Sequence, residues 1–247
     1  GALLVGTVFG AVFYTTHLVW VGEFLGPVPW LALAGLEAVL FGAGAVPIAL
    51  AYRWTARYPA RGLVQLLAVP PLIGVLWTAR EVVMGAWPYS GFPWARLGMT
   101  QVGGPLAEAV SWTSVTGLSL LIVILCASVV QWIRAGGIRF MLGLHPAVSV
   151  AALLVIAPQF PTAPAGEFRV GWVQGNGPTG YFDDKVPGDV LAAQTAATVP
   201  LYGQPMDLLA WPEGGVDADP LSDPAAAEAL DRVVRSAGAP LLMNAAT

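Results

Sequence analysis

The stretch WTSVTGLSLLIVILCASVVQWI, residues 112–133, decides the fold class of this chain. It carries no charged side chain, and it is long enough for the roughly 20 apolar residues that a helix needs to cross a bilayer. Apolar residues make up 56% of the chain and charged residues only 11%, against roughly 25% charged in an ordinary soluble domain. Most of the chain is therefore expected to lie in a membrane.

Outward from this stretch, four more segments are long and apolar enough to span a bilayer: 2–22, 29–52, 63–79 and 138–157. Together they predict a polytopic α-helical membrane domain over residues 1–160, with a long loop at 80–111. Gly6 and Gly10 in the first segment have the spacing of closely packed membrane helices.

Five of the seven arginines in residues 1–165 lie in or beside two connections between the predicted spans: Arg53, Arg57, Arg61, Arg134 and Arg139. The other two, Arg80 and Arg96, lie in the loop 80–111 and weaken this asymmetry without reversing it. With five spans, both connections fall on one side of the membrane, and the positive-inside rule makes that side cytoplasmic. The loop 80–111 and everything after residue 158 are then expected to face outward.

The loop 80–111 is rich in aromatic residues and proline, with Trp87, Tyr89, Phe92 and Trp94 close together. One interpretation is an aromatic belt at the membrane interface. The other is a segment that dips into the membrane and shapes a lipid entrance, which would require it to line a cavity.

Three ionisable residues lie within the predicted spans, namely His17, Glu37 and His145. An acid inside a membrane is costly, so Glu37 is a functional candidate. The alternative, which we favour, is a structural pair between Glu37 and His17 on the neighbouring helix.

The chain has a single cysteine, Cys126, inside an apolar run. It can form no disulfide within the chain, and no cysteine-based metal site is possible. The chain opens at Gly1 directly into apolar sequence, without an initiator methionine or a signal-peptide n-region. We expect it to begin partway through a longer protein.

Residues 166–247 differ in character, with a net charge of −7 against +3 for residues 1–165. Strand, helix, strand, helix and strand are predicted in turn at 168–174, 188–203, 207–211, 225–237 and 239–243. This alternation predicts a largely parallel sheet covered by helices. The sequence stops just after the third strand, so the domain is expected to be truncated.

Glu213 stands directly after the predicted strand 207–211, at the edge where open α/β sheets carry their sites. A carboxylate shielded from water there would suit proton transfer at neutral pH, and a loop carboxylate is the equal alternative. The remaining acids cluster in turns and are expected to be solvated charges rather than metal ligands: Asp183, Asp184, Asp217, Asp219 and Asp223. No metal, no cofactor and no nucleic-acid partner is predicted.

Two stretches resemble the apolipoprotein N-acyltransferase family. The first, within 81–106, contains SGFPW (90–94), LG (97–98), Gln101 and GPL (104–106). The second combines VQGN (173–176) with WPE (211–213). These motifs occur in the family's order on this hydropathy profile, and the resemblance runs from about the third span to the third strand.

The resemblance implies a nitrilase-like αββα sandwich outside a bacterial cytoplasmic membrane. It implies transfer of an acyl chain from a phospholipid, through a cysteine thioester, to the diacylglyceryl-cysteine of an apolipoprotein. Glu213 matches the Glu of a Glu-Lys-Cys triad, whose Lys and Cys are expected downstream of this chain. Neither Cys126 nor Lys185 matches them, so the fragment alone is expected to be inactive.

The resemblance also implies lipid-substrate contacts, which we place at Glu81, Phe92, Trp94, Tyr181 and Phe182. Tyr181 and Phe182 are the aromatic residues nearest to the position after the QGN-type motif where the family often has Trp. A further departure is Met84, which stands where a basic residue is common.

Three other functions remain open from the sequence. A membrane-tethered nitrilase-type amidase would share the WPE motif but would not need the GFPW loop. A non-catalytic anchor would associate with a polyprenol-phosphate mannose synthase, as similar membrane proteins do in some actinobacteria. A transporter is disfavoured, because residues 166–247 resemble a catalytic α/β domain.

Overall fold

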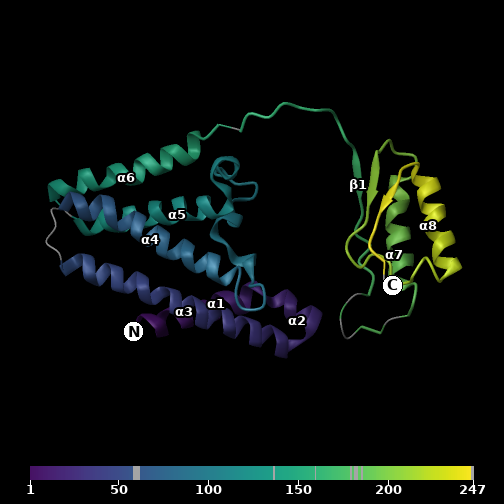
Figure 1. Ribbon diagram of the computed structural model, residues 1–247, viewed down its shortest axis with the longest axis horizontal. Coiled ribbons are helices and arrows are strands. Elements are labelled where there is room, and N and C mark those ends of the chain that lie inside the picture. The colour runs from purple at the N-terminus through teal and green to yellow at the C-terminus, as the bar shows by residue number, and fades with distance from the viewer. Residues whose placement is uncertain are drawn as a thin grey trace. The chain divides into compact units, whose positions relative to one another are not determined.

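The computed structural model describes residues 1–57, 62–135, 137–158, 160–178, 180, 183–184 and 186–245, without the side chains of residues 62–64, 135 and 137–146. The chain divides into a helical unit of residues 1–19 and 30–162, and an α/β unit of residues 163–247 together with residues 20–29. Figure 1 labels their elements.

The helical unit contains the apolar helices. Its N-terminal helix α1 (Ala2–His17) is followed, after a bend of 54°, by α2 (Val19–Leu25), of which residues 20–25 are grouped with the α/β unit. The next helix, α3 (Pro27–Arg57), belongs to the helical unit from residue 30 onward. It is followed by α4 (Gly62–Met84), α5 (Ala109–Ala135) and α6 (Gly137–Ile156).

Three described helices are long and apolar enough to cross a bilayer: α3, α4 from Gln65 onward, and α5 to Arg134. They correspond to the predicted spans 29–52, 63–79 and 112–133, and they establish a helical membrane unit. The bent pair α1 and α2 qualifies only if it is taken as one span. The fifth predicted span falls on α6, whose described apolar part is Ala147–Ile156, so the five-span arrangement stays a prediction.

Small residues allow α1 and α3 to approach closely. A Cβ atom added to Gly6 would lie 2.9 Å from the Gly42 Cα, and one added to Gly10 would lie 2.9 Å from the Ala38 Cα. Any larger side chain would separate the two helices. The spacing of Gly6 and Gly10 therefore allows the close helix–helix packing that it predicted.

The α/β unit contains a sheet of three parallel strands in the order β1–β2–β3: β1 (Val170–Trp172), β2 (Leu208–Ala210) and β3 (Leu241–Leu242). The register places Val170 beside Leu208, and Leu209 beside Leu241. The predicted parallel sheet is confirmed, with strands shorter than predicted.

Two helices pack on one face of this sheet. The first is α7 (Asp189–Thr198), prolonged by the 3₁₀ turn Val199–Leu201, and the second is α8 (Pro224–Ala237). Asp223 caps α8 by accepting hydrogen bonds from the amides of Ala225 and Ala226, and Gly238 ends the helix in a left-handed conformation. Both predicted helices are present.

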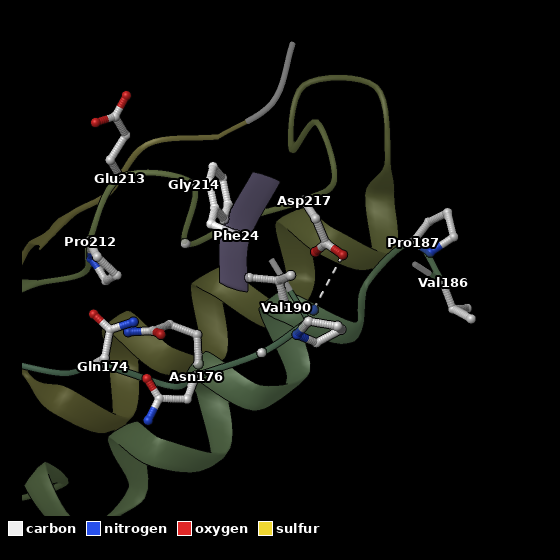
Figure 2. Close-up of a pocket in the computed structure, with 14 residues that line it drawn as sticks. Phe24, Gln174, Asn176, Val186, Pro187, Val190, Pro212, Glu213, Gly214 and Asp217 are labelled. Atoms are coloured by element: carbon white, nitrogen blue, oxygen red, sulfur yellow. Dashed lines mark hydrogen bonds between the residues drawn. The ribbon is translucent and has the colours of Figure 1, made fainter. Parts of the chain in front are cut away.

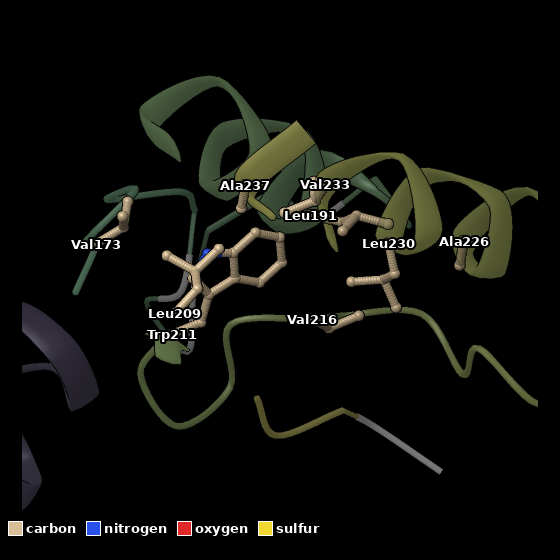
Figure 3. Packing of buried hydrophobic residues seen from close by; sticks show 9 residues of the cluster. All are labelled: Val173, Leu191, Leu209, Trp211, Val216, Ala226, Leu230, Val233 and Ala237. Carbon is tan, nitrogen blue, oxygen red and sulfur yellow. The ribbon is translucent and has the colours of Figure 1, made fainter. Parts of the chain in front are cut away.

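Buried apolar side chains from the strands and both helices form one core (Figure 3): Val173, Leu191, Leu209, Trp211, Val216, Ala226, Leu230, Val233 and Ala237. Leu209 and Val233 are fully buried at its centre. The arrangement is a small parallel α/β unit. The full nitrilase-like sandwich implied by the resemblance goes beyond these three strands and stays a prediction.

Candidate functional site

Strand β2 brings the WPE motif to the carboxyl edge of the sheet. The Trp211 amide donates to the Leu242 carbonyl at 2.9 Å, and its indole Nε1 donates to Thr198 Oγ1 at 3.0 Å. The Trp211 side chain is buried. The backbone leading to Glu213 is thus fixed by a neighbouring strand and a helix.

A tight turn follows Glu213. Gly214 has φ of +66°, a conformation that favours glycine, and its amide donates to Asn244 Oδ1 at 3.1 Å. The Gly215 amide donates to the Pro212 carbonyl, and Val216 then forms a parallel bridge with Ala245. The turn is consequently held from both sides.

The Glu213 side chain itself is exposed to solvent. Figure 2 shows its carboxylate extending away from Gln174 and Asn176. The expected position at the end of a buried strand is correct, but the expected shielding from water is absent, because the turn carries the side chain outward beyond the sheet edge.

A pocket lies between the two motif segments, with Gln174–Gly177 on one side and Pro212–Gly215 on the other (Figure 2). Gln194 and Asp217 also line it. The two motifs VQGN and WPE, far apart in the sequence, therefore form walls of the same pocket.

Asp217 caps the start of α7 from across this pocket. Its carboxylate accepts hydrogen bonds from the amides of Gly188 at 2.9 Å, Val190 at 3.3 Å and Leu191 at 3.1 Å. Burial acts to raise the pKa of Asp217, but the hydrogen bonds from these amides outweigh it and hold the pKa below its ordinary value.

The acidic turn residues have local structural partners. Asp183 accepts from the Gly180 amide at 2.6 Å, and Asp219 accepts from the Leu221 amide at 2.9 Å and from the Ser222 hydroxyl. Together with the caps made by Asp217 and Asp223, these contacts favour structural loop carboxylates over metal ligands.

In the helical unit, the aromatic loop runs from α4 to α5 through the 3₁₀ turns Pro93–Ala95 and Leu97–Gln101. The Phe92 and Trp94 rings are stacked with centroids 6.1 Å apart. Trp94 is 61% exposed, whereas Phe92 is half-buried. These two predicted substrate contacts therefore lie side by side.

Glu81 anchors this loop to α4. Its Oε1 accepts hydrogen bonds from Trp77 Nε1 at 2.7 Å and from the Leu97 amide at 3.1 Å. The side chain is 6% exposed. The family resemblance implies that Glu81 contacts substrate, and this stays a prediction; the structure gives Glu81 a loop-holding role.

Two motif glycines allow the loop to lie close against the helices. A Cβ on Gly91, whose φ is +73°, would lie 2.3 Å from the Ala86 amide nitrogen. A Cβ on Gly98 would lie 2.4 Å from the Val115 carbonyl oxygen, and the Gly98 amide donates to Ser119 Oγ at 2.8 Å. Only glycine fits either position.

The favoured pair between His17 and Glu37 is wrong. His17 is exposed, its Nε2 lies 3.4 Å from the Trp94 carbonyl oxygen, and its ring stacks on Phe13. Glu37 is buried, and its Oε2 has no hydrogen-bond partner among the described residues. The bend after His17 ends α1 and leaves His17 on the surface.

Arg80 occupies the interior instead. Its guanidinium lies 4.0 Å from the ring centroids of both Phe41 and Trp77, in cation–π contact on two sides. It is 9% exposed. A buried cation beside aromatic rings and acids thus links α3 to α4.

The predicted site residues fall into two groups. Phe92, Trp94 and Glu81 belong to one loop and its anchor in the helical unit, and Glu213 belongs to the α/β unit. Tyr181 and Phe182 lie outside the described residues.

Three residues that support the pocket were not predicted from the sequence: the buried Gln194 and Thr198, and Asn244, which fixes the turn after Glu213. The only available signal for the first two was their i, i+4 spacing, which places both on one face of a helix.

These observations define a class of protein: a helical membrane protein with a parallel α/β unit that carries a carboxylate at a strand end. Residues 1–128 match the family described as the apolipoprotein N-acyltransferase N-terminal domain. This chain belongs to the apolipoprotein N-acyltransferase family.

Curated relatives share this similarity beyond the membrane helices. Proteins named apolipoprotein N-acyltransferase from Geobacter metallireducens and Azotobacter vinelandii are 30% and 31% identical over 86% and 87% of this chain. One from Mycolicibacterium smegmatis is 29% identical over 97% of the chain. The aligned regions cover only 42–43% of these relatives, so the chain spans less than half of their length.

Proposed function

We propose that this chain supplies the membrane anchor and the general base of an enzyme that N-acylates bacterial lipoproteins. Its substrates are a phospholipid acyl donor and the diacylglyceryl-cysteine of an apolipoprotein. The Lys and Cys of the Glu-Lys-Cys triad lie in residues that continue the chain. The α/β unit faces the extracytoplasmic side of the cell membrane.

In the first step, the Glu213 carboxylate takes the proton of the cysteine thiol. The thiolate attacks the ester carbonyl of the phospholipid, and the C–O bond breaks as the lysophospholipid alkoxide leaves and regains a proton. In the second step, the lipoprotein α-amino group attacks the thioester, releasing the thiol. A covalent intermediate divides one difficult transfer into two easier ones and leads to ping-pong kinetics.

The observation that carries this proposal is the position of Glu213. It lies three residues after the end of the parallel strand β2, in a turn fixed by Asn244, and it lines a pocket whose opposite wall is Gln174–Gly177. Its exposure leaves the carboxylate accessible to a thiol supplied by another segment. Membership of the family and the apolar helices support a lipid substrate.

The test is Glu213→Gln in the full-length protein that contains this chain, with thioester formation from phospholipid as the measurement. The substitution keeps the side-chain size but removes the proton-accepting charge, so acylation is expected to fall about 10²–10⁴-fold. Glu228→Gln, at an exposed glutamate on α8, is the matched control and should acylate normally. Normal thioester formation by folded Glu213→Gln protein would exclude Glu213 as the base.

A further inference from the structure

The helix α7 carries a buried polar pair that the mechanism above does not use. Gln194 is 2% exposed and Thr198, one turn later, is fully buried. Both face a core that is otherwise apolar. Polar groups in such a core are stable only when they are hydrogen-bonded, so their partners reveal what they hold.

Both ends of the Gln194 amide are occupied by the backbone of the VQGN segment. Nε2 donates to the Val173 carbonyl at 2.6 Å, and Oε1 accepts from the Gly175 amide at 2.7 Å. These two contacts fix the orientation of the amide, because a flipped amide would oppose donor to donor. Gln194 thus clamps the segment on either side of Gln174.

Close packing adds to this clamp. A Cβ on Gly175 would lie 2.6 Å from Gln194 Oε1 and 2.7 Å from the Gln194 Cα. The loop therefore rests directly on α7, without space for a side chain between them. A shift of Gln194 would shift this wall of the pocket with it.

Thr198 holds the opposite wall. Its Oγ1 donates to the Gln194 carbonyl at 2.7 Å and accepts from Trp211 Nε1 at 3.0 Å. Trp211 is separated from Glu213 by Pro212 alone. The two motif segments are consequently tied to consecutive turns of one helix.

We propose that Gln194 and Thr198 are positioning residues that hold the Glu213 turn and the Gln174–Asn176 segment as the two walls of one pocket. This inference rests on the proposed function, since the geometry matters for the transfer of the thiol proton to Glu213. Neither side chain needs to touch the substrate; each acts through the backbone or ring that it holds.

The first test is Gln194→Met in the full-length protein, which preserves side-chain volume and removes both hydrogen bonds. Small misplacements of reacting groups are costly, so kcat for acylation should fall about 10–100-fold with the KM for phospholipid nearly unchanged. Gln204→Met, at an exposed glutamine in the same unit, should behave as wild type. Acylation per folded Gln194→Met molecule equal to wild type would overturn the proposal.

Thr198 provides a second, independent pair of variants. Thr198→Ser keeps the hydroxyl and should retain the acylation rate, whereas the isosteric Thr198→Val should lose it. Equal kcat for the two folded variants would show that the hydroxyl positions nothing. This pair also decides the question if Gln194→Met does not fold.

A readout that needs no acyl transfer separates this inference from the proposed function. Hydrogen exchange of a peptide covering residues 173–177 should accelerate about fivefold or more in Gln194→Met, the factor expected for loss of one hydrogen bond. Exchange in α8 should be unchanged. Unaltered exchange at 173–177 would overturn the inference, whereas a wild-type protein without thioester would overturn the proposed function alone.

Discussion

Glu81 offers the sharpest test of how the aromatic loop is held. Leucine at this position removes the acceptor of two hydrogen bonds and leaves Trp77 Nε1 and the Leu97 amide without it. An unsatisfied buried donor costs about 1–3 kcal/mol, so the two together cost about 2–6 kcal/mol. Glutamine keeps a carbonyl oxygen at the place of Oε1 and should retain both contacts.

This cost is expected to fall on the loop rather than on the helices. Detaching residues 93–101 from α4 re-exposes both donors to water, and 1.4 kcal/mol corresponds to a factor of ten in an equilibrium. The detached population should therefore rise about 30-fold or more in Glu81→Leu. Trypsin cleavage after Arg96, the only basic residue between Glu81 and Ala109, measures that population in membranes.

The matched pair of variants makes the result decisive. Glu81→Gln should be cleaved at nearly the wild-type rate, and Glu81→Leu much faster. Equal cleavage of wild type and Glu81→Leu would refute the anchoring role of Glu81. Fast cleavage of both variants would show that the negative charge, rather than the acceptor oxygen, holds the loop.

Two further predictions concern the α/β unit and the orientation of the chain. The pKa of Asp217 is lower in the folded state than its ordinary value. The stability that Asp217 contributes is therefore present above the unfolded pKa of about 3.9, and it is lost as pH falls through the folded pKa. In Asp217→Asn, the thermal-unfolding midpoint should depend less on pH between pH 7 and pH 3 than it does in wild type. A pH dependence as steep as that of wild type would contradict the capping role of Asp217. For orientation, cysteines placed at Arg57 and Asp219 in a Cys126→Ala background should be labelled from opposite sides of the membrane. Labelling from the same side would exclude the five-span topology.

Hydropathy and periodicity correctly predicted those helices and strands whose position depends mainly on which side chains avoid water. The run 112–133 became α5, and the alternation after residue 166 became a parallel sheet with α7 and α8 on one face. Such patterns can be recognised within one segment, because the side chains on one face of a helix or strand share the same environment over many residues.

Side-chain partners could not be predicted in the same way. Glu81 bonds an amide 16 residues away, and Gln194 bonds one 19 residues away. His17 turned out to be at the surface because α1 ends there, and Glu213 is exposed because a glycine turn follows it. Each outcome depends on where a chain bends rather than on the residue type.

The two motif regions nevertheless share one physical solution. Irregular loops leave backbone amides that need partners when they are buried, and in both units helix-borne side chains provide them. Ser119 accepts from Gly98 in the aromatic loop, and Gln194 accepts from Gly175 in the VQGN segment.

At both positions the glycine is required because the loop lies directly against the helix. Gly98 and Gly175 therefore act by allowing a loop backbone to contact a helix backbone directly, and a larger residue at either position would displace its loop from the helix.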